Sequence, residues 1–203
     1  MKRALLPFVM AFLSLGLSPA ADAQGFLEVV TGAAVPIGDD RYADVVDTRY
    51  KLGLRAGGFG GSVFESARLA VELGADWTPS DTELDSSLIN VDIHRFRFLA
   101  GIRLLGAVGK NALLFARLAG GLDWIRAEGT ASLLGFRATY EEDDYGLALE
   151  PGVGALFRIG GLGLGFQLAA PFAFHDDDDE GDGVDYEYKA YDFDMLVTLG
   201  AGW

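Results

Sequence analysis

The sequence contains no cysteine, only two histidines among 203 residues, and no uninterrupted run of 18 apolar residues. The lack of cysteine excludes disulfides and thiolate metal sites. The lack of a long apolar run excludes a membrane-spanning helix. Basic residues are also scarce, because 16 Lys and Arg stand against 30 Asp and Glu. The resulting formal net charge of −14 argues against nucleic acid as a partner.

The N-terminal segment has the features of a secretory signal. Lys2 and Arg3 precede an apolar run from Ala4 to Leu17, and the small-x-small pattern of a cleavage site follows at residues 21–23. The run is too short for a membrane anchor. We therefore expect residues 1–23 to be a cleaved signal peptide and residues 24–203 to form one exported domain. Because the signal carries a net charge of +1, its removal changes the formal net charge from −14 to −15.

The last stretch of the chain alternates strictly between apolar and other residues. Every second position is apolar, and both ends of the series are aromatic: Tyr191, Phe193, Met195, Val197, Leu199, Ala201 and Trp203. Successive side chains of a β-strand point to opposite faces, so this pattern predicts a strand with one apolar and one polar face. Seven earlier runs repeat it, near residues 26–35, 50–59, 66–77, 94–104, 114–124, 145–158 and 162–174.

The connections between these runs are alternately long and short. The predicted long loops are residues 36–49, 78–91, 126–143 and 175–187, and the short turns are residues 60–62, 106–111 and 160–161. Strands of about ten residues can cross a bilayer when tilted. The sequence therefore predicts an all-β protein, an eight-stranded antiparallel up-and-down transmembrane β-barrel with periplasmic short turns. Pro151 lies within the sixth predicted strand, where we expect a bulge or kink.

Side-chain volume decides which face points inward. An eight-stranded barrel has an interior just wide enough for side chains, and the aromatic face would overfill it. The opposite arrangement, a soluble ligand-carrying barrel with an apolar interior, is disfavoured for that reason. The inward face carries eight basic and seven acidic residues, which predict a lumen charge network of Glu28, Lys51, Arg55, Arg68, Glu72, Asp76, Arg95, Arg97, Arg103, Arg117, Asp123, Glu150, Arg158, Asp192 and Asp194.

Aromatic residues gather at the two ends of the predicted strands. The long-loop ends carry Tyr50, Trp77, Trp124, Tyr145, Phe174 and Tyr191, and the short-turn ends carry Phe157 and Trp203. Two such belts are typical of the two interfaces of a membrane.

The signal peptide, the alternating runs and the terminal series from Tyr191 to Trp203 together resemble the OmpA/OmpX-like outer-membrane β-barrels, also described as the porin family. The resemblance covers residues 24–203 and implies localisation in the outer membrane of a Gram-negative envelope. It further implies contact with outer-membrane lipid and lipopolysaccharide. The terminal series resembles the signal that the barrel-assembly machinery recognises during insertion, with Trp203 in place of the usual Phe.

The acidic loop from His175 to Glu187 is the one candidate metal site. Asp176, Asp178, Glu180 and Glu187 fall at spacings like those of an EF-hand, and carboxylates suit Ca²⁺ or Mg²⁺. The flanking strands differ from the helices of an EF-hand. A solvated acidic loop and loose bridging of divalent cations to lipopolysaccharide phosphates are the alternatives.

The two histidines give little support for catalysis. His94 is expected to face outward and His175 to lie in a loop, and neither belongs to a His-x-Ser motif like that of lipid A deacylases. We expect no enzyme activity and no cofactor. The expected function is an integral outer-membrane protein with a structural, envelope-integrity or surface-interaction role, its lumen plugged by charge. The alternatives are a small-solute porin or channel and a lipid A-modifying barrel enzyme.

Overall fold

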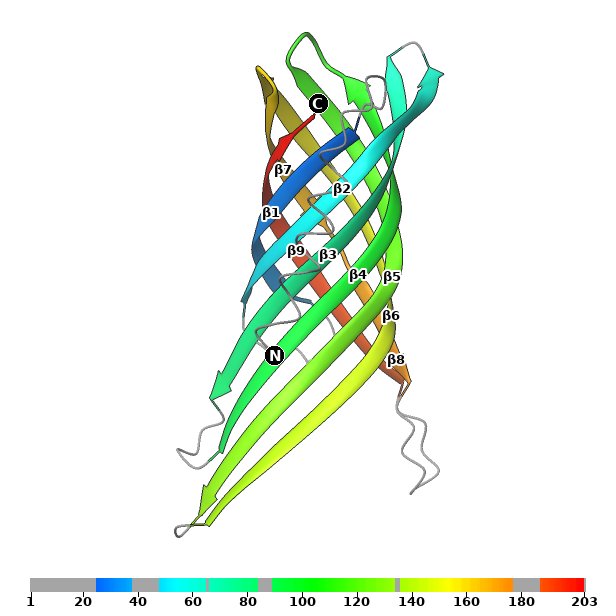
Figure 1. Cartoon of the computed structure of the whole chain (residues 1–203). Coiled ribbons are helices and arrows are strands. Elements are labelled where there is room, and N and C mark those ends of the chain that lie inside the picture. Colours follow the sequence, from blue (N-terminus) through cyan, green and yellow to red (C-terminus); the bar gives the residue numbers. More distant parts are fainter. Residues whose placement is uncertain are drawn as a thin grey trace.

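The structure is a computed structural model that describes residues 25–37, 48–64, 66–83, 89–133, 136–176 and 187–202. These residues form a tall, closed and strongly tilted barrel of strands (Figure 1). The strands are β1 (Gly25–Pro36), β2 (Arg49–Phe64), β3 (Ala67–Glu83), β4 (Ile89–Ala107), β5 (Ala112–Leu133), β6 (Phe136–Ile159), β7 (Leu162–Ala169), β8 (Phe172–Asp176) and β9 (Glu187–Ala201). None of the described segments is a helix with the length and apolar character needed to span a membrane.

The ring has eight positions, because β7 and β8 are two halves of one strand. Both halves pair with β6 and with β9 in a single register, in which Gly152 lies opposite Ala169 and Leu149 opposite Phe172. Every neighbouring pair is antiparallel, and β9 pairs with β1 to close the ring. The predicted eight-stranded antiparallel up-and-down barrel is confirmed.

Two prolines, Pro151 and Pro171, interrupt the hydrogen bonds of the strand formed by β7 and β8, which lies between β6 and β9. The expected bulge at Pro151 was wrong, because β6 pairs with β5 through Leu118 and Pro151 without a shift of register. The interruption lies instead in the next strand, at Ala170 and Pro171. The Ala170 N–H donates to the Pro151 carbonyl at 3.0 Å, and the Asp192 N–H donates to the Pro171 carbonyl at 3.2 Å. Neither proline has an N–H to donate in return, so two neighbouring pairs each lose one bond.

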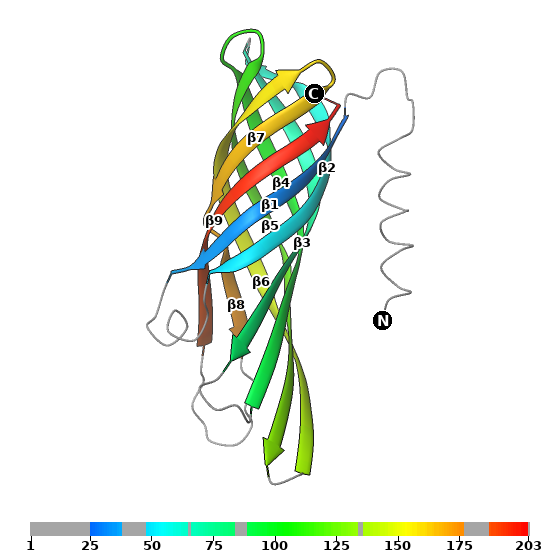
Figure 2. The ribbon, with the colours of Figure 1, turned by 90° about the vertical axis from the view of Figure 1, so that its left-hand side faces the viewer.

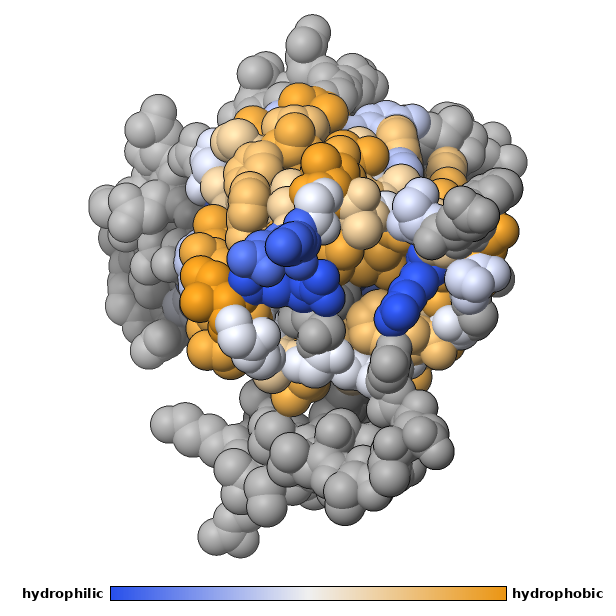
Figure 3. Space-filling view, turned by 90° about the horizontal axis from the view of Figure 1, so that it is seen from above, coloured by the Kyte–Doolittle hydropathy of each residue, from blue (hydrophilic) through white to orange (hydrophobic). Residues whose placement is uncertain are grey.

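The barrel is turned inside out relative to a soluble protein. Large apolar side chains are exposed on the outer surface of every strand of the ring, whereas the buried side chains include many charged ones. Seen from the short-turn end, apolar residues surround the rim and hydrophilic residues gather in two places nearer its centre (Figure 3). The prediction from side-chain volume is therefore confirmed: the aromatic residues of the predicted outer face point out and the charges point in, while Phe26 and Phe115 are buried inside.

Four strands continue well past the others at the long-loop end. The pairing of β3 with β4 extends to Glu83 and Asn90, and that of β5 with β6 to Leu133 and Phe136. Residues 78–83, 89–95, 125–133 and 136–145 thus form a four-stranded sheet, here called the extension (Figure 2). Most of the predicted loops 78–91 and 126–143 are strand. The outward-facing residues of these segments are polar, which suggested loops. They are strand residues, and the outer face of the sheet is polar here instead of apolar.

Candidate functional site: the filled lumen and the extension

Thirteen of the fifteen charged residues predicted to face the lumen are buried there. The structure adds Arg49, which is also buried. The resulting lumen network has seven basic members, Arg49, Lys51, Arg55, Arg95, Arg97, Arg103 and Arg117, and seven acidic ones, Glu28, Glu72, Asp76, Asp123, Glu150, Asp192 and Asp194. The equal numbers matter, because an unpaired buried charge costs several kcal/mol.

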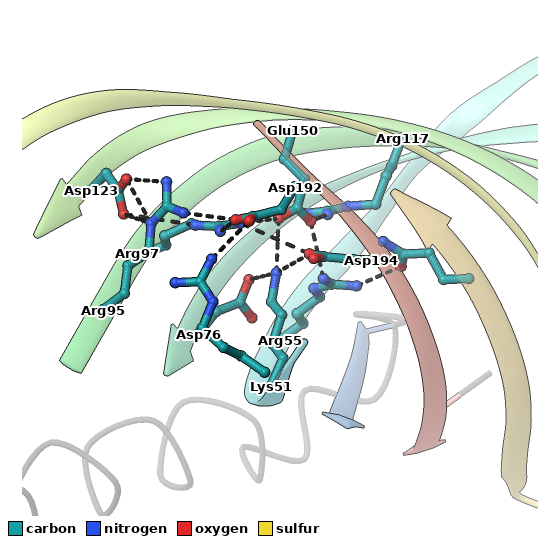
Figure 4. A network of polar contacts seen from close by, with 12 residues as sticks. Lys51, Arg55, Asp76, Arg95, Arg97, Arg117, Asp123, Glu150, Asp192 and Asp194 are labelled. Atoms are coloured by element: carbon teal, nitrogen blue, oxygen red, sulfur yellow. Dashed lines mark hydrogen bonds and ion pairs between the residues drawn. The ribbon is translucent and has the colours of Figure 1, made fainter. Parts of the chain in front are cut away.

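Lys51 and Glu150 form the centre of the lumen network (Figure 4). The Lys51 Nζ lies 2.8 Å from Asp76, 3.0 Å from Glu150 and 2.7 Å from Asp194. Glu150 in turn accepts hydrogen bonds from Arg55 at 3.2 Å and from Arg117. These residues come from strands that lie around the ring, so the centre of the network links opposite walls of the barrel.

Toward the long-loop end, two adjacent arginines on β4 share two carboxylates. Arg95 donates through Nε to Asp123 at 2.9 Å and through Nη1 to Asp192 at 2.7 Å. Arg97 donates to the same Asp192 oxygen at 2.7 Å, and Arg49 donates to the other one at 2.7 Å. Like charges are thus separated by shared carboxylates, an arrangement in which each guanidinium has a planar partner.

Toward the short-turn end, the lumen network meets an apolar floor. Arg103 donates to both Glu28 oxygens, at 3.1 Å and 2.8 Å, and also contacts Glu72 at 2.7 Å. Its guanidinium lies between two rings, 4.9 Å from the centroid of Phe26 and 4.7 Å from that of Phe115. Cation–π contacts of this kind are favourable when the cation is desolvated. The lumen is therefore filled by charged side chains over most of its length and by aromatic side chains at one end.

Two predicted members lie outside the lumen network. Arg68 is exposed near the start of β3, and Arg158 is half-buried and donates to the carbonyl of Lys110 at 2.9 Å in the adjacent turn. Both residues have the inward parity. They fail as network members because alternation gives the face of a residue and not its height along the barrel axis.

Besides Arg49, the predicted lumen network lacks Gln167, which has the inward parity, and His175, and the side chains of both contact its members. Gln167 is fully buried and accepts a hydrogen bond from Arg55 at 2.6 Å. His175 was expected in a loop, but it lies in β8 and is 2% exposed. Its Nε2 is 3.1 Å from Asp123 and its Nδ1 is 2.7 Å from Asp144. The signal was available, because residues 163, 165 and 167 of the same run face inward and His175 shares their parity.

The terminal series alternates as expected, with Tyr191, Phe193, Met195, Val197, Leu199 and Ala201 on the outer face. Trp203, Asp178 and Glu180 lie outside the described residues. Asp176 and Glu187 pair through their backbones where β8 and β9 end. Within the described ranges, no group of three or more His, Asp or Glu residues is placed to hold a metal ion. His94 lies on the outer face beside Trp77, with 6.2 Å between the ring centroids.

An aromatic row marks the base of the extension on the outer surface. Trp77, Phe96, Trp124 and Tyr145 are direct cross-strand neighbours on β3, β4, β5 and β6. Their rings stack, with centroids 5.1 Å apart for Phe96 and Trp124 and 6.1 Å apart for Trp124 and Tyr145. Such a row is what the boundary between lipid and water selects.

Beyond this row, toward the long-loop end, the outer face of the sheet changes its character. The outer face, apolar below the row, carries Asp92, Arg126, Glu128, Glu141 and Asp143 above it, and Arg126 pairs with Glu128 at 2.8 Å and with Glu141. The inner face of the extension is mixed: it carries Ile93, Ile125, Ala127, Ala138 and Tyr140 together with the polar Thr78, Ser80, Glu142 and Asp144. A charged outer face is suited to water, so the extension stands clear of any lipid layer that surrounds the apolar band.

No protein family matches the sequence, and no curated protein does. Solved structures do match. Neisserial surface protein A has a TM-score of 0.50 at 10% identity, over 89% of this chain and 97% of that chain. A major outer membrane protein from Thermus thermophilus has a TM-score of 0.50 at 12% identity, over 87% and 98%. Ail, the attachment invasion locus protein of Yersinia pestis, has a TM-score of 0.45 at 15% identity, over 87% and 98%.

At these identities the first two matches establish the fold alone, and they cover nearly the whole of each chain. The closed antiparallel ring with eight strand positions agrees with them. This chain therefore has the OmpA/OmpX-like fold of the outer-membrane β-barrels.

Proposed function

We propose that this chain is an integral outer-membrane protein that conducts no solute and acts at the cell surface through its extension. The barrel itself contributes to the integrity of the envelope. The proposal assigns the molecule no catalytic step. The observation that carries the proposal is the combination of a filled lumen with a sheet that continues past the aromatic row.

The filled lumen supports a barrel that does not conduct. All fourteen charged members of the lumen network are at most 5% exposed, and they link strands across the interior. An eight-stranded barrel has no room for water beside such side chains. A solute would have to break several charge-assisted hydrogen bonds in a medium of low dielectric constant, which is costly.

The extension supports a surface role. Its charged outer face begins where the aromatic row ends, so it is placed in water rather than in lipid. It lies at the long-loop end, which in bacterial outer-membrane barrels is the external one. A hydrogen-bonded sheet of four strands outside the membrane offers a continuous surface, which suits it to contact other molecules.

The orientation can be tested with single cysteines, because the protein has none of its own. Thr139→Cys places a thiol in the extension, and Val108→Cys places one in a short turn; both side chains are exposed. In intact cells, a maleimide that cannot cross the membrane should label position 139 alone, and in broken cells it should label both. Labelling of position 108 alone in intact cells would reverse the orientation.

The function can be tested by trimming the extension. A variant in which residues 126–143 are replaced by a two-residue turn should fold, as judged by a shift of gel mobility on boiling. Cells that carry either protein are tested for binding to a panel of immobilised polypeptides of basic, neutral and acidic net charge. Cells with the full chain should bind at least one member of the panel, and cells with the trimmed chain should not bind that member. Equal binding refutes a role for the extension. In planar bilayers both proteins should be silent, and a steady unit conductance refutes the closed lumen.

A further inference from the structure

The charges outside the lumen are divided between the two ends of the barrel. Besides members of the lumen network, the described side chains of the extension include one basic residue, Arg126, and six acidic ones, which are Asp92, Glu128, Glu141, Glu142, Asp143 and Asp144. At the short-turn end the balance is reversed, because Arg68, Lys110 and Arg158 lie there. No Asp or Glu occurs in the described segments of that half outside the lumen network, which are residues 53–64, 66–71, 101–116, 152–169 and 195–202. The two ends therefore suit partners of opposite charge.

Two of these basic residues point toward the centre of the short-turn end. Arg68 has the inward parity of Glu72 on β3, and Arg158 has that of Glu150 on β6. Phe157 and Ile159, the neighbours of Arg158 in the chain, are exposed on the outer face. Seen from this end, hydrophilic residues lie inside an apolar rim (Figure 3). Arg158 is therefore turned away from the lipid that surrounds the barrel.

An apolar floor separates the basic residues of the short-turn end from the carboxylates of the lumen network. It consists of Phe26, Ala70, Leu105 and Phe115, with Phe59 and Leu113 partly buried against them. On β6 the fully buried Leu156 lies opposite Leu113, and Arg158 is the next inward residue toward the end. On the lumen side of the floor, Glu28 already bonds to Arg103, and Glu72 bonds to Arg103 and Arg117. These carboxylates are thus neutralised by cations of their own.

Arg158 and Lys110 have no carboxylate partner among the described residues. The Arg158 guanidinium is half-buried and donates through Nη2 to the Lys110 carbonyl at 2.9 Å. The Arg158 N–H donates to the Asn111 carbonyl at 2.8 Å, which holds β6 against the turn that carries the exposed Lys110. A guanidinium has five N–H donors in a planar fork that matches a carboxylate. Most of the donors of Arg158 thus remain for an anion from outside the barrel.

We propose that the short-turn end is a docking surface for a segment of a periplasmic polypeptide that carries both acidic and apolar residues. The surface, here called the basic mouth, is formed by Phe59, Arg68, Lys110, Leu113 and Arg158. Acidic side chains of the segment bond to Arg158 and Lys110, and its apolar side chains cover the partly buried Phe59 and Leu113. The proposal goes beyond the surface role of the extension, because it concerns the opposite end of the molecule and the opposite compartment.

Two other occupants fit the basic mouth less well. Lipid headgroups lie outside the apolar rim, whereas Arg158 points inside it. The extension of a second copy is acidic, but in a membrane where all copies have the same orientation it lies on the other side. A polypeptide can approach from the water and can present acidic and apolar groups together, which matches an apolar centre with charged residues around it.

Synthetic peptides of ten residues test the partner chemistry, with the full chain in nanodiscs of phosphatidylcholine, a lipid without net charge. A peptide of alternating glutamate and valine should bind, measured by fluorescence anisotropy. Alternating glutamate and serine should bind at least about tenfold more weakly, because serine cannot cover the floor. Alternating glutamine and valine should also bind at least about tenfold more weakly, because it lacks the charge. If the three peptides bind equally, or if none binds, the proposal is overturned.

Variants of the protein locate the peptide on the barrel. Arg158→Gln should weaken binding of the glutamate–valine peptide about tenfold, and Arg158→Lys less, because lysine keeps the charge but not the planar fork. Arg126→Gln removes the same charge at the other end and is the matched control, so it should leave binding unchanged. If Arg126→Gln weakens binding as much as Arg158→Gln does, the peptide does not bind at the basic mouth and the proposal is overturned.

Lys110→Gln keeps the test decisive even if Arg158→Gln does not fold, because Lys110 is exposed in a turn. It should weaken binding of the glutamate–valine peptide about threefold and reduce the dependence of binding on salt. Unchanged binding and unchanged salt dependence would contradict a contact with Lys110 and overturn the proposal.

A lipid occupant is tested by native mass spectrometry from nanodiscs of phosphatidylcholine mixed with anionic phosphatidylglycerol. If phosphatidylglycerol remains bound to the unaltered protein, and Arg158→Gln combined with Lys110→Gln removes it while no peptide binds, the occupant is a lipid headgroup and the proposed partner is wrong. The outcomes are distinct from those for the extension. A failed trimming test would refute the surface role alone, because the peptides report on the other end, whereas a reversed orientation in the cysteine labelling would overturn the periplasmic partner.

Discussion

Replacement of Lys51 by methionine tests whether the lumen network holds the barrel together. Methionine has nearly the length of lysine and fills the same space without the charge. The change leaves three buried carboxylates without their shared cation. Glu150 keeps Arg55 at 3.2 Å, Arg97 at 3.4 Å and Arg117, so it is still well neutralised.

The other two carboxylates lose far more. Among the ion pairs of the described residues, Asp76 has only its contact with Lys51 at 2.8 Å. Asp194 would be left with Arg97 at 3.8 Å. Removal of one partner from a buried ion pair costs about 3–5 kcal/mol. We therefore expect the free energy of unfolding of Lys51→Met to fall by about 4 kcal/mol.

The measurement is equilibrium unfolding by urea in lipid vesicles, followed by tryptophan fluorescence. Lys110→Met is the matched control, because Lys110 is exposed in a short turn, and its cost should be within about 0.5 kcal/mol. The double variant Lys51→Met with Asp76→Asn removes the orphaned charge and should recover about 2 kcal/mol of the loss. The reasoning is refuted if Lys51→Met costs no more than the control, or if the double variant is less stable than the single one.

Three further changes probe other parts of the structure by the same measurement. Arg103→Met removes both hydrogen bonds to Glu28 and the cation between Phe26 and Phe115, so the free energy of unfolding should fall by about 3–5 kcal/mol. Arg68→Met should be nearly neutral. Equal costs would contradict the placement of Arg68 outside the network. Trp124→Ala breaks the stacked row and should cost about 2 kcal/mol, and Trp124→Phe clearly less; no difference between them would argue against stacking. His175→Leu removes the contacts with Asp123 and Asp144 and should cost about 1–3 kcal/mol, with His94→Leu as the outward-facing control.

The ring of strands and most of the lumen network could be predicted because alternation has a period of two. Once side-chain volume had decided which face points inward, the inward position of Arg95 followed from that of Arg97 two residues later. The partners could not be predicted, since Arg97 meets Glu150 and Asp192 from strands far away in the sequence. Those contacts depend on strand tilt and register, which a pattern within one strand does not contain.

The errors have physical reasons of two kinds. Arg68 and Arg158 have the right parity but lie where the lumen opens, and alternation carries no information on height. The extension was predicted as loops because its outer face is polar beyond Trp124. The rule that an apolar face points outward holds only where lipid is the solvent. Segments such as Ile125–Ala127 follow the opposite rule in the same strand.

The two prolines give the wall a place of weakness whose reinforcement comes from within. One backbone bond is missing between β6 and the strand formed by β7 and β8, and one between that strand and β9. Separation of the barrel wall would therefore start between β6 and β9. Lys51, which belongs to the far side of the ring, binds Glu150 on β6 and Asp194 on β9 at the same time. Lys51 therefore links β6 and β9 through the interior, on both sides of the strand with the missing backbone bonds. If single barrels are unfolded by force, the strands should separate first where these backbone bonds are missing. Loss of the Lys51 side chain should lower the force required.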